Sequence, residues 1–171
     1  MTNVRRSSSA LAIVLVAAAC SSGSKPSSKP SVSAQTVAPT TGTQPASGLQ
    51  ISSRVFANGD PIPKQYTCDG RGATPELHFS GVPAGTRQLR LVVHDPDAPI
   101  KGGFTHWTVS NIPPTTASMP PVPATAKEDV KWRPPCPPPG SAPHHYRFIL
   151  TAQSSPDVVL AQATLVGTYH R

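Results

Sequence analysis

Residues 146–152 read YRFILTA, and their pattern decides the class of fold. From Tyr146 to Leu150 every second side chain is large and apolar, with Arg147 between two of them. This period of two is typical of a strand buried on one face, because successive side chains in a strand point to opposite faces. We therefore expect His144 and Tyr146 to share one face of this strand, and His145 to point away.

Short runs of β-forming residues recur along the chain, separated by turn-forming residues. The sequence holds 22 prolines and 12 glycines, which argue against long helices. Strands are expected at residues 50–54, 76–79, 89–93, 105–112 and 163–169, and one helical turn at 158–162. Several short strands at close spacing predict a mainly β fold, an antiparallel β-sandwich with little helix.

The N-terminus has the pattern of an export signal. Arg5 and Arg6 precede the apolar run ALAIVLVAAA at residues 10–19, which is too short to span a bilayer. Cys20 follows directly and resembles the cysteine of a bacterial lipobox, which is acylated and begins the mature chain. We expect residues 1–20 to be a signal peptide that ends at a lipidation site, Cys20. Ordinary secretion with cleavage near Ala19 is the alternative.

A spacer separates this signal from the folded part of the chain. Residues 21–48 are almost wholly Ser, Thr, Pro, Gly, Ala, Gln and Lys, too poor in apolar side chains to offset the entropy of ordering them. They are expected to form a disordered tether. Residues 49–171 are long enough for one hydrophobic core and are expected to form one domain, held at the extracytoplasmic face of the cell membrane.

Charge and cysteine content narrow the function classes. The formal net charge is +7, but the basic residues are scattered singly, whereas a nucleic-acid-binding protein shows a basic stripe. Neither Cys68 nor Cys136 sits in a CxxC pair, and no HxxxH pattern accompanies them, so neither a metal site nor a cofactor is expected. The two cysteines are an even pair in an oxidising compartment, which favours a disulfide; two buried free thiols are the alternative.

Polar side chains stand at the ends of the expected strands. DPDAP (95–99) follows one strand, and its simplest interpretation is a turn whose aspartates cap backbone N–H groups. His106 opens the next strand, where it either donates to an anion or is a half-buried structural histidine. The run CPPPG (136–140) forms a rigid apolar wall and leaves the N–H groups of Cys136 and Gly140 available to a ligand oxygen.

Seven segments follow one another in a specific order. They are YTCDG (66–70), ATPELHFSGVP (73–83), DPDAP (95–99), GGFTHWTVSNIP (102–113), CPPPG (136–140), HHYRF (144–148) and LVGTYHR (165–171). In this order they resemble the phosphatidylethanolamine-binding protein family, in its bacterial Raf-kinase-inhibitor-like branch. The resemblance covers residues 55–171 and implies a β-sandwich with a shallow pocket at one end that holds a phosphate or a similar anion.

The resemblance also implies roles for single residues. Imidazole N–H, phenol O–H and backbone N–H groups converge on the anion, while Asp95 orients a histidine or meets a ligand amine. Asp97 has a mostly structural role, and the backbone N–H of Cys136 faces the anion. The ligand-binding residues implied in this way are Asp95, Asp97, His106, Cys136, Pro137, Pro138, His144 and Tyr146.

Three features depart from the family pattern. Residues 133–135 (RPP) replace small, flexible residues at the pocket rim, and His145 replaces a stronger base. Only QSSPDVVLAQ (153–162) stands where the family has a helix of about a dozen or more residues. We expect this shortened flank to open one side of the pocket or to expose an apolar patch.

The expected function is that of a non-catalytic envelope lipoprotein. Its ligand would be an anionic small molecule or a phospholipid head group. The alternative is a regulator that binds a protein partner, such as a kinase or a serine protease. A hydrolase that uses Asp95, His106 and His144 is the third candidate, but no serine or cysteine stands in a nucleophile-elbow pattern.

Overall fold

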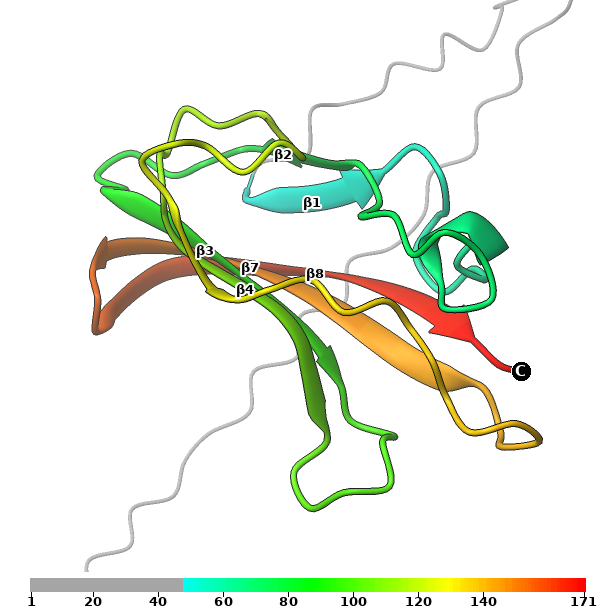
Figure 1. The fold of residues 1–171 in the computed structure, drawn as a ribbon. Coiled ribbons are helices and arrows are strands. Elements are labelled where there is room, and N and C mark those ends of the chain that lie inside the picture. Colours follow the sequence, from blue (N-terminus) through cyan, green and yellow to red (C-terminus); the bar gives the residue numbers. More distant parts are fainter. Residues whose placement is uncertain (1–47) are drawn as a thin grey trace, which may run out of the picture. The chain divides into compact units, whose positions relative to one another are not determined.

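Two antiparallel sheets face each other in the part of the chain that the structure, a computed structural model, describes: residues 48–171 (Figure 1). The larger sheet has the strand order β6-β4-β3-β7-β8 and the smaller has the order β1-β2-β5. This arrangement confirms the predicted antiparallel β-sandwich. The predicted signal peptide, Cys20 and nearly all of the predicted tether lie outside the described residues.

Each predicted strand is present in the structure to within a few residues, except that the last one begins earlier, at residue 158. Neither β5 nor β6 was predicted, because both are short and neither shows a clear period of two. The larger sheet contains β3 (Gln88–Asp95), β4 (Phe104–Ile112), β6 (Lys127–Val130), β7 (His144–Ser155) and β8 (Val158–Tyr169); the smaller contains β1 (Gln50–Ser53), β2 (Leu77–Ser80) and β5 (Ser118–Met119).

The prediction of a helical turn at residues 158–162 is wrong. These residues begin β8, which forms a long hairpin with β7, and Val158 pairs with Ser155. The hairpin satisfies the backbone groups of two adjacent β-branched residues that fit a strand better than a helix. The only helical element in residues 48–171 is the 3-10 turn η1 (Lys64–Tyr66), and no helix there is long and apolar enough to cross a membrane.

The core lies between the two sheets, and its pattern follows the sequence. Leu89, Leu91 and Val93 on β3 are fully buried, and so are the alternate residues Phe148 and Leu150 on β7. The smaller sheet contributes its own apolar face to this core. Truncation of one such large buried side chain to Ala lowers the free energy of unfolding by about 2–5 kcal/mol. The residues that close the core from that side are Ile51, Leu77, Phe79 and Met119.

A β-bulge interrupts β4 at His106. Val93 pairs with Trp107 and His94 pairs with Thr105, so His106 has no partner on β3. A bulge inserts one extra residue into a strand and re-aims the neighbouring side chains. Here it breaks the alternation, and the residues from His106 to Val109 are all buried.

The edge of the larger sheet that β8 forms is only partly covered. The segment 57–62 lies along the second half of β8, where Gly59 N–H donates to Val166 O (2.7 Å) and Thr168 N–H donates to Asp60 O (2.9 Å). At the other end of β8, the apolar side chains of residues 158–160 are 42–55% exposed. The shortened flank thus leaves three large apolar side chains exposed at this end of β8.

Candidate functional site

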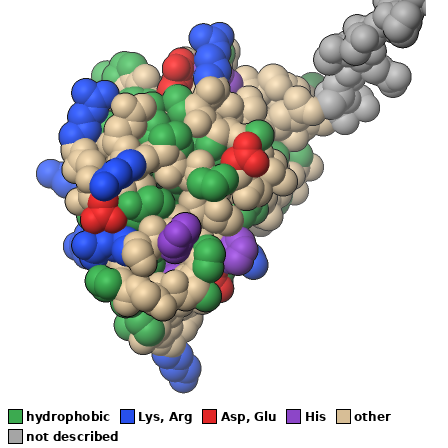
Figure 2. Space-filling view, turned by 90° about the vertical axis from the view of Figure 1, so that its right-hand side faces the viewer, with side chains coloured by type: hydrophobic (Ala, Val, Ile, Leu, Met, Phe, Trp, Pro, Cys, Tyr) green, Lys and Arg blue, Asp and Glu red, His purple; other side chains and the backbone are tan. Residues whose placement is uncertain are grey.

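One end of the larger sheet is hollowed by a cavity of about 430 Å³. The end of β3, the start of β4 and the start of β7 meet there, and residues 133–138 form the opposite wall. Most of the lining is apolar, and Figure 2 shows one face of the molecule on which histidines lie close to hydrophobic side chains. The lining residues are Asp95, Ala98, Pro99, Ile100, Phe104, His106, Arg133, Pro134, Cys136, Pro137, Pro138, His144 and Tyr146.

Seven of the eight predicted ligand-binding residues line this cavity. Asp97 is the exception, and it lines a smaller adjoining hollow of about 290 Å³. There Asp97 Oδ2 accepts hydrogen bonds from both the backbone N–H and the ring Nδ1–H of His145, each 2.8 Å long. These bonds from His145 hold the pKa of Asp97 below its ordinary value. Asp97 thus ties the loop after β3 to β7.

Asp95 and His144 form a buried pair on the cavity floor. Nδ1–H of His144 donates to Asp95 Oδ2 (2.7 Å), and Asp95 Oδ1 accepts the backbone N–H of Asp97 (2.9 Å). Asp95 is 2% exposed and His144 5% exposed. Asp95 therefore orients His144, which is one of its two implied roles.

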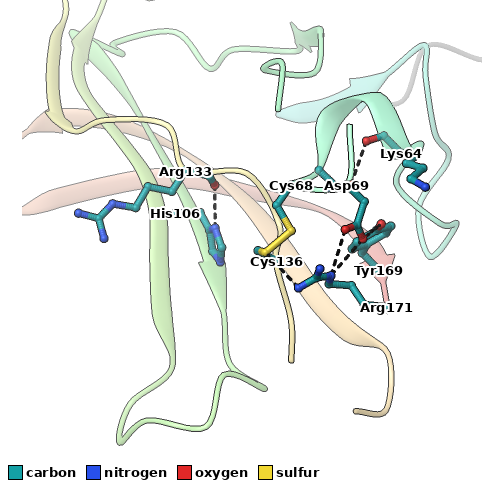
Figure 3. Close-up of a disulfide and its surroundings, with 9 residues drawn as sticks. Lys64, Cys68, Asp69, His106, Arg133, Cys136, Tyr169 and Arg171 are labelled. Atoms are coloured by element: carbon teal, nitrogen blue, oxygen red, sulfur yellow. Dashed lines mark hydrogen bonds and ion pairs between the residues drawn. A yellow bond between two sulfur atoms is a disulfide. The ribbon is translucent and has the colours of Figure 1, made fainter. Parts of the chain in front are cut away.

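His106 is held by the backbone of Arg133. Its Nδ1–H donates to Arg133 O (2.7 Å; Figure 3), and its own carbonyl accepts the N–H of Arg133 (2.9 Å). The ring also packs edge-on against Phe104, with centroids 4.8 Å apart. Burial lowers the pKa of His106, and the hydrogen bond to Arg133 opposes this only in part, so the ring is neutral near pH 7.

Tyr146 places a hydroxyl without a partner beside His106. The ring is fully buried, its centroid is 5.1 Å from that of His106, and its hydroxyl is buried with no hydrogen-bond partner among the described residues. Burial and the negative charge of Asp95 raise the pKa of Tyr146 well above its ordinary value, so the hydroxyl keeps its proton. Leaving a buried donor unpaired costs about 1–3 kcal/mol, so this hydroxyl calls for a partner from outside the chain, a water or a ligand atom.

A disulfide between Cys68 and Cys136 fastens the wall of the cavity (Figure 3). It confirms the predicted bridge over the alternative of two free thiols. Beside it, the N–H of Cys68 donates to Pro135 O (3.0 Å). The proline run is thereby anchored to the loop that follows η1.

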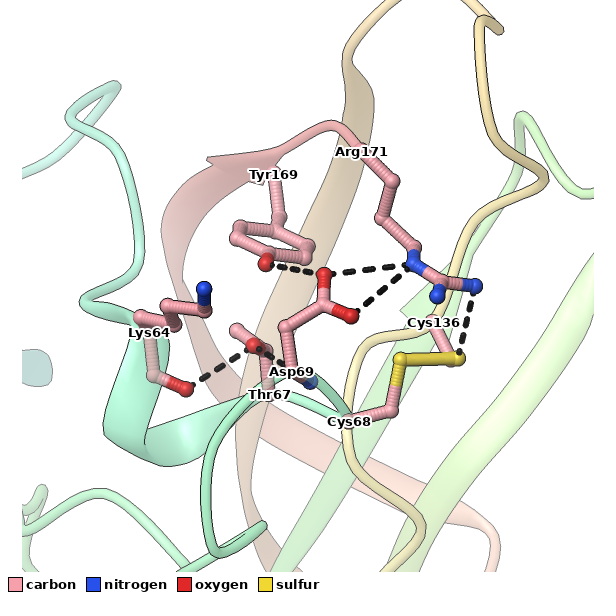
Figure 4. A network of polar contacts seen from close by, with 7 residues as sticks. All are labelled: Lys64, Thr67, Cys68, Asp69, Cys136, Tyr169 and Arg171. Carbon is pink, nitrogen blue, oxygen red and sulfur yellow. Dashed lines mark hydrogen bonds and ion pairs between the residues drawn. A yellow bond between two sulfur atoms is a disulfide. The ribbon is translucent and has the colours of Figure 1, made fainter.

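A polar network supports the same wall (Figure 4). Asp69 accepts a hydrogen bond from the Tyr169 hydroxyl (2.7 Å), and its two oxygens share the single Nε–H of Arg171 (3.1 Å each). The Tyr169 hydroxyl, followed by Arg171, holds the pKa of Asp69 below its ordinary value. The expectation that the N–H of Gly140 is available to a ligand is wrong, because it donates to Arg171 O (3.1 Å).

The sequence predicted the proline wall of the cavity but not the apolar residues Ile100 and Phe104. Phe104 belongs to the segment GGFTHWTVSNIP (102–113) and Ile100 lies just before it, but single apolar residues near glycines carry no signal of their own. Arg133, expected only to alter the rim, supplies the one Lys or Arg side chain that lines the cavity within the described residues. Its guanidinium lies 5.5 Å from the centroid of the Phe104 ring, a cation–π contact.

Comparisons with known proteins agree with this architecture. The family model for phosphatidylethanolamine-binding protein matches residues 52–170. A UPF0098 protein of Aquifex aeolicus is 37% identical over 153 residues, covering 72% of this chain and 89% of its own. LppC of Mycobacterium tuberculosis H37Rv, named as a candidate lipoprotein, is 37% identical over 188 residues, covering 93% of this chain and 92% of its own.

Two solved structures share the fold. One is a proposed phosphatidylethanolamine-binding protein homologue, CT736 of Chlamydia trachomatis, with a TM-score of 0.68 and 31% identity over 74% of this chain and 99% of its own. The other is YbcL of Escherichia coli, described as a member of the mammalian family, with a TM-score of 0.66 and 28% identity over 72% of this chain and 98% of its own. The family model spans almost the whole described domain, and the chain therefore belongs to the phosphatidylethanolamine-binding protein family.

Proposed function

We propose that this protein is a non-catalytic binding protein of the bacterial envelope, and that its pocket takes a phosphate-type anion. The anion would belong to a phospholipid head group or to a phosphorylated small molecule. The observation that carries the proposal is the buried hydroxyl of Tyr146, a protonated donor on a cavity-lining residue, with no partner among the described residues. Arg133 at the rim adds a positive charge, which favours an anion.

The lining chemistry favours binding over catalysis. Among the described lining residues there is no serine or threonine, and the one cysteine, Cys136, is held in a disulfide. Asp95 and His144 form the kind of pair that activates a nucleophile, but the cavity offers no side chain for them to activate. Turnover of phosphate or acyl esters that is lost in Asp95→Asn would instead establish a hydrolase.

An envelope location is supported by the N-terminal pattern and by one relative. The alignment to LppC covers 93% of this chain, so it extends into the first 47 residues. Together with the apolar run before Cys20, this supports anchoring through a lipid on that cysteine.

The pocket is tested by calorimetry with phosphoethanolamine on the natural protein and on Tyr146→Phe. We expect the variant to bind at least about tenfold more weakly, because a hydrogen bond to a charged group is lost. Since the hydroxyl has no protein partner, its removal should leave the free energy of unfolding unchanged or raise it. Tyr66→Phe is the matched control, because Tyr66 packs against the core and does not line the cavity. Equal affinities for the natural protein and Tyr146→Phe would refute the site.

A further inference from the structure

His106 and Tyr146 both line the cavity, and their polar groups have opposite hydrogen-bonding character. A backbone carbonyl can only accept, so the 2.7 Å contact to Arg133 O places a proton on Nδ1 of His106. In a neutral imidazole the other nitrogen, Nε2, then carries a lone pair and acts as an acceptor. The second bond between the same residues, from the N–H of Arg133 to the carbonyl of His106, joins their backbones and keeps Arg133 O beside the ring.

The surroundings of His106 keep the ring neutral. It is 5% exposed and packs against Phe104 and Tyr146, neither of which carries a charge. From β3, the carboxylate of Asp95 favours a proton on the ring and His94 disfavours one, as does the side chain of Arg133.

The carboxylate of Asp95 does not reverse the preference of His106 for its neutral form. The oxygens of Asp95 accept hydrogen bonds from His144 on β7 and from a backbone N–H, and its charge offsets only part of the cost of burying a protonated His106 ring. Desolvation is the largest effect on His106 and lowers its pKa.

Tyr146 supplies the complementary donor. Its hydroxyl retains its proton and has no partner among the described residues. The rings of Tyr146 and His106 lie with centroids 5.1 Å apart, close enough for both to contact one tetrahedral group. An unprotonated oxyanion can accept a hydrogen bond from the Tyr146 hydroxyl, but it has no proton to donate to Nε2 of His106. Two acceptors that face each other in a buried site are destabilising.

We propose that the pocket binds a phosphate group in its singly protonated form. The P–O–H group donates to Nε2 of His106, and an unprotonated oxygen accepts from the Tyr146 hydroxyl. This inference rests on the proposed function and adds to it the protonation state of the ligand. It makes His106 the residue that separates phosphate esters from sulfate esters, because a sulfate monoester carries no proton to donate at neutral pH.

Methyl phosphate and methyl sulfate test this by calorimetry on the full-length protein in detergent. At pH 6 the methyl phosphate monoanion has the same charge as methyl sulfate and nearly the same shape, and differs from it by the proton. We expect methyl phosphate to bind at least about tenfold more tightly. Its affinity should also fall about tenfold for each pH unit above about 6, the second pKa of a phosphate monoester, as the monoanion disappears.

His106→Gln provides the matched variant, because an amide can turn either its donor or its acceptor toward the ligand. We expect the preference for methyl phosphate to shrink to about threefold or less in this variant. Methyl sulfate that binds the natural protein as tightly as methyl phosphate would overturn the inference and leave the anion pocket standing. So would an affinity for methyl phosphate that stays constant from pH 6 to pH 8. Failure of both esters to bind would overturn the proposed function as well.

Discussion

The disulfide that fastens the pocket wall should be a large contributor to the stability of the domain. Cys68 and Cys136 are separated by 68 residues, so the bridge closes a long loop in the unfolded chain. For a loop of this length the chain-entropy relation gives about 4 kcal/mol at 25 °C, near the upper end of measured values. The Cys68→Ala/Cys136→Ala double variant is expected to lose about that much free energy of unfolding.

Urea unfolding followed by tryptophan fluorescence measures this loss. The buried Trp107 packs against Trp132, with ring centroids 5.8 Å apart, so their emission should report unfolding of the core. Adding a dithiol reductant to the natural protein should reproduce the midpoint of the double variant, and the variant itself should not respond to the reductant. A loss below about 1 kcal/mol would refute the reasoning, because the loop would then contribute far less than its length predicts.

Three further outcomes are expected. Gly167→Ala should lower the free energy of unfolding by about 1–3 kcal/mol in the same urea assay, because its Cβ would lie 2.5 Å from Ile62 and 2.9 Å from Phe56; an unchanged midpoint would contradict this. Burial lowers the pKa of His106 in the folded state, so its contribution to stability is present above the unfolded value of about 6.5 and is lost as the pH falls. The natural protein should therefore lose more stability than His106→Gln between pH 7 and pH 5, and equal losses would exclude this effect. Cys20→Ala should release the protein from the membrane fraction into the medium, whereas continued retention would argue against a lipid anchor.

The sheets were largely predictable because their signal is local. The alternation of apolar and polar residues around Tyr146 in the sequence corresponds to an alternation of buried and exposed side chains in β7, with His144 and Tyr146 buried and His145 exposed. The segment 158–162 was misjudged because residues with adjacent apolar side chains fit a helical turn as well as a strand. What decides between them is the ladder to β7, which brings residues on both sides of the hairpin into register.

The candidate site was predictable only as a set of segments. The motifs placed Asp95 and His144 near one another, but no local pattern indicates that Asp95 pairs with His144 while Asp97 pairs with His145. The clamp on His106 depends on a backbone carbonyl 27 residues away, and a carbonyl has no sequence signature. The hydrogen bond from the Gly140 N–H to Arg171 O could not be predicted for the same reason.

The half-covered edge of β8 has a consequence for amide hydrogen exchange. The N–H groups of Val166 and Thr168 are bonded to Asn58 Oδ1 and Asp60 O, so their exchange requires the segment 57–62 to detach. By the alternation of the strand, the N–H groups of Gln162 and Thr164 point to the same side, where no described residue accepts them. One strand should therefore show fast exchange at residues 162 and 164 and slow exchange at 166 and 168. The boundary between the two rates marks where the sheet can open without disturbing the end that carries the pocket.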